Sequence, residues 1–422
     1  MENLNFAKVT ILSGILTCFR LVCGLLISKV VAIYTGPAGI ANLGQLQNFV
    51  SFINGFISNQ VSQGVTRYSS EHKSNYEDAK QFWRAAVKLS FIACCFIAIL
   101  GLIFSQKLSG YLFHNSNYYW LIIVALSVLP LNIANSIFLG VLNGLGEYNK
   151  FFIANILAIL SSVISMTGLV YFFGLKGALI SAALNNAIAG AWLIAIILKR
   201  PWFKWRYWVG QTPKHHLKEM RNYFYMGIIG ALTGPISLIA VRTILTNNFS
   251  IDDAGYWQAV SKISEAYLAI LTTAMTVYYF PKTAAAKSVS EHLSILKTGA
   301  VVVIPLALLM AFAIFGLKDF IISILFTKDF HEARRLFFFQ NMGDFVRICS
   351  WLFATILLAK GYFKINAVLE ISFSITYPLL VKFLTLYWGL EGVSLAYFIT
   401  YAIYLVAVML IYYWHLNKKV LC

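Results

Sequence analysis

Charged side chains inside long apolar stretches are the residues of this 422-residue sequence best suited to chemistry. A charge that faces lipid costs about 3 kcal/mol or more, so such a residue should face a wet cavity or an opposite charge. Three of these residues are acids: Glu265, Asp344 and Glu370. Six are cations: Arg20, Lys29, Arg242, Lys262, Arg347 and Lys382. Because cations outnumber acids, the pattern favours an anionic ligand.

Three of the cations are placed to share one ligand. Arg20 lies near the middle of the first apolar stretch, and Lys29 and Arg242 precede Ala-Gly dipeptides by nine and twelve residues. Cations that reach one cavity from two helical bundles would form an anion site. We therefore expect these three to bind substrate, with Lys262 and Arg347 as further ligands. Lys382 is expected to extend toward the membrane interface.

The acids have cations at helical spacing. Lys262 and Glu265 are three residues apart, as are Asp344 and Arg347, so each pair lies on one helix face. One interpretation is that these pairs only neutralise charge and pack helices. The other is that Glu265, Asp344 and Glu370 couple transport to ion movement, because a carboxyl beside a cavity can exchange a proton.

Uncharged polar residues gather between positions 45 and 63. Gln45, Asn48 and Asn59 belong to this group and partly share a helix face. Side-chain amides both donate and accept hydrogen bonds, which suits the hydroxyls of a sugar. No His or Cys cluster has metal-ligand spacing, so we expect no metal, no cofactor and no catalytic residue.

The composition requires a membrane to bury these elements. Hydrophobic residues make up 59% and charged residues 12% of the chain, with a mean hydropathy of +0.74. Long continuous apolar runs exclude barrel strands and predict an all-α polytopic membrane protein. About twelve spans are expected, at 8–34, 38–66, 82–104, 117–144, 151–173, 177–198, 222–247, 254–281, 295–317, 334–359, 364–388 and 392–416.

The two halves repeat. Gly39 and Gly177 are 138 residues apart, and Gly255 and Gly392, in similar local sequences, are 137 apart. We predict two six-helix bundles, 1–198 and 222–422, related by a pseudo-twofold axis along the membrane normal. Residues 199–221 are the expected linker, rich in basic residues, Trp and Tyr, and lying in the cytoplasmic headgroup region. Transporters place substrate sites at such repeat interfaces.

The positive charges predict the orientation. With the N-terminus in the cytoplasm, 21 Lys and Arg lie in cytoplasmic segments and six on the opposite side. This asymmetry predicts that both termini are cytoplasmic. The net charge of +17 is spread over many loops, which argues against nucleic acid as a partner.

Three stretches are distinctive: GPAGIANLGQLQNF, GYWQAVSKISEAYL, and LFFFQNMGDFVR followed by ILLAKG. They resemble the Wzx flippases of the polysaccharide-transporter branch of the MOP superfamily, near those for enterobacterial common antigen lipid intermediates and O-antigen units. The likeness includes Gly255, Trp257 and Gln258, and the Gly343–Asp344 pair. Lys262 departs from the family's small polar residue at that place.

The resemblance implies a substrate and a mechanism. The substrate would be an undecaprenyl-diphosphate-linked oligosaccharide, moved from the cytoplasmic to the periplasmic leaflet of the bacterial inner membrane by alternating access driven by H⁺ or Na⁺. Membrane lipids and the polymerase and chain-length machinery are the expected partners. Two alternatives stay open. A MATE-like drug or cation antiporter would favour an acidic cavity, and a polyprenyl-glycan polymerase would need a larger extramembrane loop than the 23 residues at 199–221.

Overall fold

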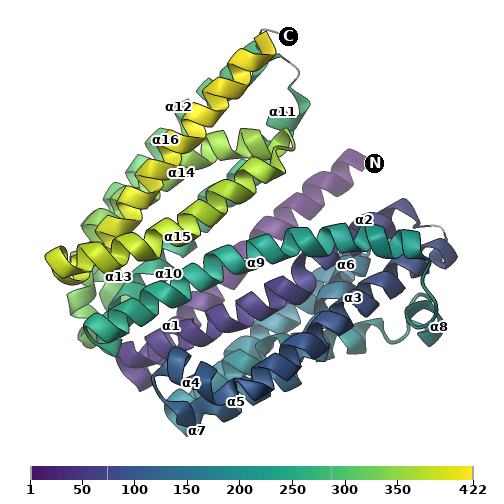
Figure 1. The fold of residues 1–422 in the computed structure, drawn as a ribbon, viewed down its shortest axis with the longest axis horizontal. Coiled ribbons are helices and arrows are strands. Elements are labelled where there is room, and N and C mark those ends of the chain that lie inside the picture. The colour runs from purple at the N-terminus through teal and green to yellow at the C-terminus, as the bar shows by residue number, and fades with distance from the viewer. Residues whose placement is uncertain (1, 74, 287, 421–422) are drawn as a thin grey trace. The chain divides into compact units, whose positions relative to one another are not determined.

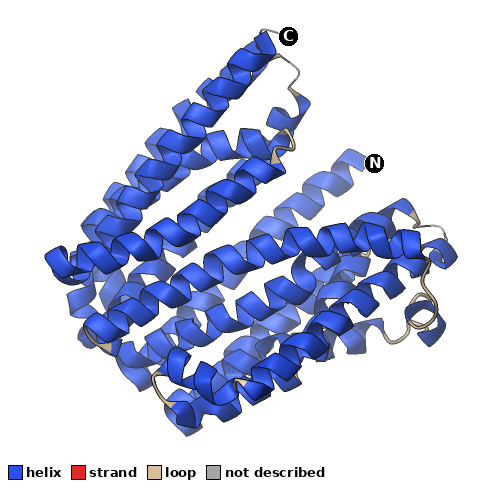
Figure 2. Ribbon diagram, in the orientation of Figure 1, coloured by secondary structure: helices blue, strands red, loops and turns tan. Residues whose placement is uncertain are grey.

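The described part of the chain is helical throughout. The computed structural model describes residues 2–73, 75–286 and 288–420. Helices and short connections account for all of these residues, and no strand occurs among them (Figure 2). The predicted all-α class is confirmed.

The helices follow one another with short connections (Figure 1). In the first half they are α1 (Glu2–Asn54), the π-helical η1 (Gly55–Asn59), α2 (Gln60–Glu71), α3 (Tyr76–Ile103), α4 (Ser105–Phe113), η2 (Ser116–Tyr118), α5 (Tyr119–Ser127), α6 (Leu129–Gly144), α7 (Tyr148–Ile197) and α8 (Trp205–Trp208). In the second half they are α9 (Lys214–Asn248), α10 (Ile251–Ala274), the π-helical η3 (Met275–Tyr279), α11 (Phe280–Ala285), α12 (Val289–Gly316), α13 (Lys318–Leu325), η4 (Lys328–Leu336), α14 (Phe337–Ala359), α15 (Phe363–Trp388), η5 (Gly389–Glu391) and α16 (Gly392–Val420).

Seven described stretches are long and apolar enough to cross a membrane. Three of them, Ile11–Ile57, Tyr148–Ile197 and Lys364–Trp414, hold 47, 50 and 51 residues, about twice the ~20 that one crossing needs. The first two are broken where Gly36 and Gly174 leave helical geometry, and η5 interrupts the third. With the more polar α9 and α10, the helices match the twelve predicted spans within a few residues at most ends.

The chain forms two compact units. Unit 1 comprises residues 1–34 and 42–239, and unit 2 comprises 35–41 and 240–422. The division therefore falls inside α9, whereas the sequence placed it before residue 222. Aromatic contacts account for the difference: Tyr223 and Phe224 of α9 pack edge-on against Tyr68 and Phe56 of unit 1, with ring centroids 6.3 and 5.9 Å apart.

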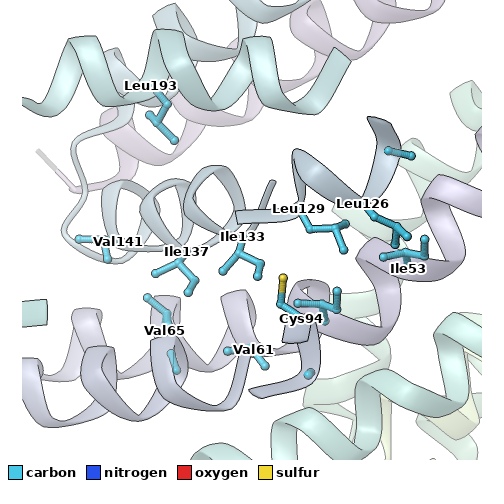
Figure 3. Close-up of a cluster of buried hydrophobic side chains, with 14 of the residues drawn as sticks. Ile53, Val61, Val65, Cys94, Leu126, Leu129, Ile133, Ile137, Val141 and Leu193 are labelled. Carbon is cyan, nitrogen blue, oxygen red and sulfur yellow. The ribbon is translucent and has the colours of Figure 1, made fainter. Parts of the chain in front are cut away.

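Unit 1 is held by an apolar core and a tightly packed helix pair. Figure 3 shows the core side chains, which include Ile53 and Val61 from the second span and Ile133 and Ile137 of α6. Helix α2 lies against α6, where the Ser62 hydroxyl donates to the Ser136 carbonyl oxygen at 2.6 Å. Lipid tails cannot form hydrogen bonds, so a bond of this kind between helices supplies the serine hydroxyl with a partner inside the membrane.

The segment after α7 is a packed part of unit 1. Trp202 is fully buried, and its ring contacts Trp83 of α3 with centroids 6.3 Å apart. The Trp202 indole N–H donates to Glu147 Oε1 at 3.0 Å, and Arg200 pairs with the same carboxylate at 2.8 Å. Trp205 is 80% exposed.

The internal repeat has a physical counterpart in each half. Gly174 (φ 54°, ψ −131°) and Gly389 (φ 55°, ψ −144°) adopt the same left-handed backbone conformation, which favours glycine. A Cβ on Gly177 would lie 1.8 Å from the Leu169 carbonyl oxygen, eight residues upstream. Likewise, a Cβ on Gly392 would lie 2.6 Å from a carbonyl oxygen eight residues upstream. The segments 174–177 and 389–392 are therefore tight connections between helices with the same backbone geometry.

Candidate functional site

A buried carboxylate is the centre of the polar site in unit 2. Asp344 of α14 is 1% exposed. The Tyr267 hydroxyl of α10 donates to its Oδ2 at 2.6 Å, and the Tyr397 hydroxyl of α16 donates to its Oδ1 at 2.9 Å. The Ser264 hydroxyl of α10 also hydrogen-bonds with this carboxyl. Donors from two other helices thus surround a charge that the apolar interior would otherwise disfavour.

Gly343 lets α16 reach this carboxylate. A Cβ on Gly343 would lie 2.4 Å from Cδ1 of Tyr397 and 3.2 Å from the Phe398 Cα. Only a residue without a side chain allows the Tyr397 ring to lie against α14 here. The Gly343–Asp344 pair therefore has a local explanation: the glycine makes room for the ring whose hydroxyl binds the next residue.

Arg347 is connected to Asp344 through Tyr397. Its Nη1 donates to the Tyr397 hydroxyl oxygen at 3.1 Å, and its guanidinium carbon lies 5.4 Å from the centre of the Tyr401 ring. Asp344 and Arg347 were predicted to share a helix face as a pair. They do lie together, and the tyrosine hydroxyl bridges them.

Four other embedded charges of unit 2 lie within electrostatic range of this group. Glu265 interacts with Arg347, Lys262 and Arg242, and Glu370 interacts with Arg347. Glu265 and Glu370 are exposed, while Lys262 and Arg347 are half-buried. The site therefore combines the buried Asp344 with two acids nearer the surface of the unit and with three cations, while a fourth embedded cation, Lys382, is exposed on α15.

Arg242, predicted as a substrate ligand, is buried and bonded to other side chains of unit 2. It is 3% exposed, donates through Nη2 to Gln258 Oε1, and lies over the Trp257 ring at 5.4 Å. Trp257 and Gln258 belong to the Gly-x-Trp-Gln motif, and a Cβ on Gly255 of that motif would lie 2.1 Å from the Pro37 carbonyl oxygen. Trp257 and Gln258 of the motif thus hold the Arg242 side chain, and Gly255 lets the backbone at Pro37 come close to α10.

Unit 1 carries its embedded cations on α1. Arg20 is exposed, and its Nη2 donates to Asn155 Oδ1 of α7 at 3.1 Å. Lys29 is half-buried. Nine residues are about two and a half helical turns, so the two side chains leave α1 on opposite faces. The acids of unit 1 all lie near helix ends: Glu2, Glu71, Glu77, Asp78, Glu147 and Glu219.

The predicted amide group is only partly described. Gln45 is 2% exposed and Asn48 is half-buried, and their spacing of three residues places them on one face of the second span. The Asn59 side chain lies outside the described ones. Nearby, Asn132 of α6 donates to Asn54 Oδ1 at 3.3 Å, so part of the amide lining serves helix packing.

Sequence reasoning missed the tyrosines as functional groups. Tyr397, Tyr401 and Tyr404 are spaced by four and three residues, which places them on one face of α16. Tyr397 and Tyr401 lie with centroids 4.8 Å apart, and Tyr401 and Tyr404 6.2 Å apart. This spacing was a visible signal that α16 presents a polar aromatic face.

The fold is that of a multi-pass helical membrane protein, and solved transporters of the MOP superfamily share it. A MATE family multidrug transporter of the MOP superfamily, in its inward-facing conformation, superposes with a TM-score of 0.78 at 15% identity, covering 94% of this chain and 95% of that one. The lipid II flippase MurJ, in its inward closed conformation, gives a TM-score of 0.74 at 14% identity and covers 96% and 86%. At such identities the likeness establishes the fold.

The chain belongs to the polysaccharide biosynthesis protein family, whose model matches residues 7–286. A relative named lipid III flippase, from Escherichia coli strain K12, is 24% identical over 417 residues and covers 95% of this chain and 96% of its own length. A protein of the same name from Shigella flexneri matches equally. The resemblance noted in the sequence is thereby confirmed at the level of the family.

Proposed function

We propose that this protein is a flippase for undecaprenyl-diphosphate-linked oligosaccharide of the O-antigen or enterobacterial common antigen type. It moves the lipid-linked glycan from the cytoplasmic to the periplasmic leaflet by alternating access. Membership of the polysaccharide biosynthesis family supports this proposal, as does the full-length similarity to relatives named lipid III flippase. The related transporters also support a non-enzymatic role.

The observation that carries the proposal is the uneven distribution of embedded charge. Arg20 and Lys29 lie in α1, while the acids of unit 1 lie near helix ends. In unit 2, Arg242, Lys262 and Arg347 are matched by three acids. The embedded charges of α1 are therefore cationic, which suits an anionic ligand. A diphosphate is the group in this substrate class that needs such charge.

The predicted ligands have different roles in this proposal. Because Arg20 and Lys29 leave α1 on opposite faces, they contact the anionic substrate at different positions. Gln45, Asn48 and Asn59 offer amides to the glycan, and the polyprenyl tail stays in lipid. Arg242 mainly positions its helix, because its guanidinium is already held by Gln258 and Trp257.

Asp344, with Glu265 and Glu370, is the proposed coupling site for H⁺ or Na⁺. The Asp344 carboxyl is buried and accepts hydrogen bonds from two tyrosine hydroxyls. Burial disfavours its negative charge and the hydrogen bonds favour it, so a change in these bonds would change whether the carboxyl binds a proton. We place the protein in the bacterial inner membrane with both termini in the cytoplasm. Its proposed partners are the polymerase and chain-length machinery that would receive the translocated unit.

A second function, drug or cation antiport, is favoured by one observation. The acids Glu265 and Glu370 are exposed in unit 2, and the fold is shared with a MATE family multidrug transporter. An antiporter of this kind would bind a cation at these acids. The cations of α1 would then serve no purpose in binding.

Complementation of a strain that lacks a lipid-linked-glycan flippase separates the two functions. We expect the wild type to restore surface glycan and Lys29→Ala to lose it. Lys382→Ala is the matched control, because Lys382 is an embedded cation that is exposed on α15. Drug resistance conferred by the wild type without restored glycan would overturn the proposal in favour of the antiporter.

A further inference from the structure

The Tyr397 hydroxyl lies between a cation and a buried acid. Arg347 Nη1 is 3.1 Å from the hydroxyl oxygen, and that oxygen is 2.9 Å from Asp344 Oδ1. Two helices contribute to this three-residue chain, since Asp344 and Arg347 lie on α14 and Tyr397 lies on α16. No role for this tyrosine was predicted from the sequence.

The chemistry of the three groups fixes the direction of the hydrogen bonds. A guanidinium can only donate, so the Tyr397 oxygen must accept from Arg347. The single hydroxyl proton is then directed to Asp344. Tyr267 donates to the other carboxylate oxygen at 2.6 Å. While Arg347 holds this place, Asp344 receives donors on both oxygens, and these donors favour its ionised, acceptor-only form.

We propose that Tyr397 is a positioning residue that transmits the position of Arg347 to Asp344, and so decides when Asp344 takes up a proton. When Arg347 moves away to an anion or to a nearby acid, the Tyr397 oxygen loses its donor. The hydroxyl can then turn and accept a hydrogen bond from a protonated Asp344. This inference rests on the proposed function only in naming the anion, the diphosphate of the substrate.

The ring of Tyr397 is fixed, so that only the hydroxyl can turn. Gly343 lies under the ring, and the rings of Tyr377 and Tyr401 contact it with centroids 5.8 and 4.8 Å away. A fixed ring with a rotatable O–H is suited to a hydrogen-bond switch, because switching needs no movement of a helix.

Other charged and titratable groups surround Asp344 and also influence its protonation. The neighbouring elements contribute Tyr267 and Glu265 from α10, Arg347 from α14, Tyr377 from α15, and Tyr397 and Tyr401 from α16. Glu265 and Glu370 lie within range of Arg347 and are the nearby acids that could draw it away. The diphosphate would compete with them for the same guanidinium.

The direct test is the protonation of Asp344 in purified full-length protein in lipid. Infrared difference spectra between pH values report the carboxylic C=O band, and the part that disappears in Asp344→Asn belongs to Asp344. Tyr397→Phe keeps the ring and removes the hydroxyl. We expect the Asp344 band to titrate about one pH unit higher in this variant, the effect of one lost charge-assisted hydrogen bond.

Tyr404→Phe is the matched control. Tyr404 lies on the same face of α16 and is 8% exposed, as Tyr397 is, and its hydroxyl makes no described bond to Asp344. We expect its Asp344 band to titrate as in the wild type. An unchanged band in Tyr397→Phe, or an equal shift in both variants, would overturn the proposal.

A double-mutant comparison separates transmission through the hydroxyl from direct charge effects. Arg347→Gln alone should also raise the titration midpoint, and it tests the link independently if Tyr397→Phe does not fold. In the Tyr397→Phe background, the Arg347→Gln shift should shrink by at least about half a pH unit. Fully additive shifts would mean that Arg347 acts on Asp344 by its charge alone, which contradicts the proposal.

Transport is measured separately so that the two failures are distinguishable. If the Asp344 band shifts as expected but the wild type moves no lipid-linked glycan, the proposed function fails and the switch stands. If the wild type transports glycan and Tyr397→Phe leaves both the band and the pH dependence of transport unchanged, the switch fails and the function stands.

Discussion

Replacing Gly343 by alanine tests the contact on which the site depends. The added methyl carbon would lie 2.4 Å from Tyr397 Cδ1 and 2.8 Å from its Cε1. Ordinary carbon–carbon contact begins near ~3.5 Å, so the overlap is about 1 Å. The ring has little room to retreat, because Tyr377 and Tyr401 pack against it, and the backbone at Phe398 is 3.2 Å from the new methyl group. Overpacking of this kind costs about 1–3 kcal/mol.

The assay is thermal unfolding of the purified protein in detergent, followed by tryptophan fluorescence. We expect Gly343→Ala to unfold at a lower temperature than the wild type. Gly168→Ala is the control, because a Cβ at Gly168 of α7 meets no atom within 4 Å. Adding Tyr397→Leu to Gly343→Ala should recover part of the loss, since it removes the ring that clashes. A Gly343→Ala protein at least as stable as the wild type would refute the close approach of α16.

Three further predictions concern topology, substrate binding and the repeat. A cysteine at Trp205, which is 80% exposed, should react with impermeant reagents only from the cytoplasmic side, and labelling of intact cells from the periplasm would contradict the orientation. Arg20→Ala and Lys29→Ala should each lower glycan transfer in proteoliposomes about tenfold or more, through loss of one charge-assisted bond, and wild-type rates in both would exclude them as ligands. Gly177→Ala and Gly392→Ala should both lower the unfolding temperature, because each Cβ would strike a carbonyl oxygen eight residues upstream; an effect at only one would argue against equivalent turns.

The arrangement of the spans was largely predictable. Apolar runs of about twenty residues give the helices, and the glycine landmarks give their repeat, because both features are local in sequence. The π-helical segments η1 and η3 were not predicted. Both lie in spans whose apolar pattern is also compatible with an α-helix, so composition alone cannot locate them.

The site was only half predictable. Helical spacing brought Asp344 and Arg347 to one face, but the residue that joins them lies 53 positions from Asp344, and Tyr267 lies 77 positions away. Such partners depend on how α10, α14 and α16 pack. Arg242 illustrates the same limit: its depth suggested a ligand, whereas its burial against Trp257 and Gln258 could be seen only in three dimensions.

Leaflet transfer of a defined lipid-linked glycan in proteoliposomes tests directly whether this protein is a flippase. Purified protein would be reconstituted with an undecaprenyl-diphosphate oligosaccharide, and a glycan-modifying enzyme outside the vesicles would report which leaflet holds the sugar. We expect wild-type protein to render the protected glycan accessible, a proton or sodium gradient to change the rate, and Lys29→Ala to lose this activity. Transfer no faster than in protein-free vesicles, with or without either gradient, would contradict it.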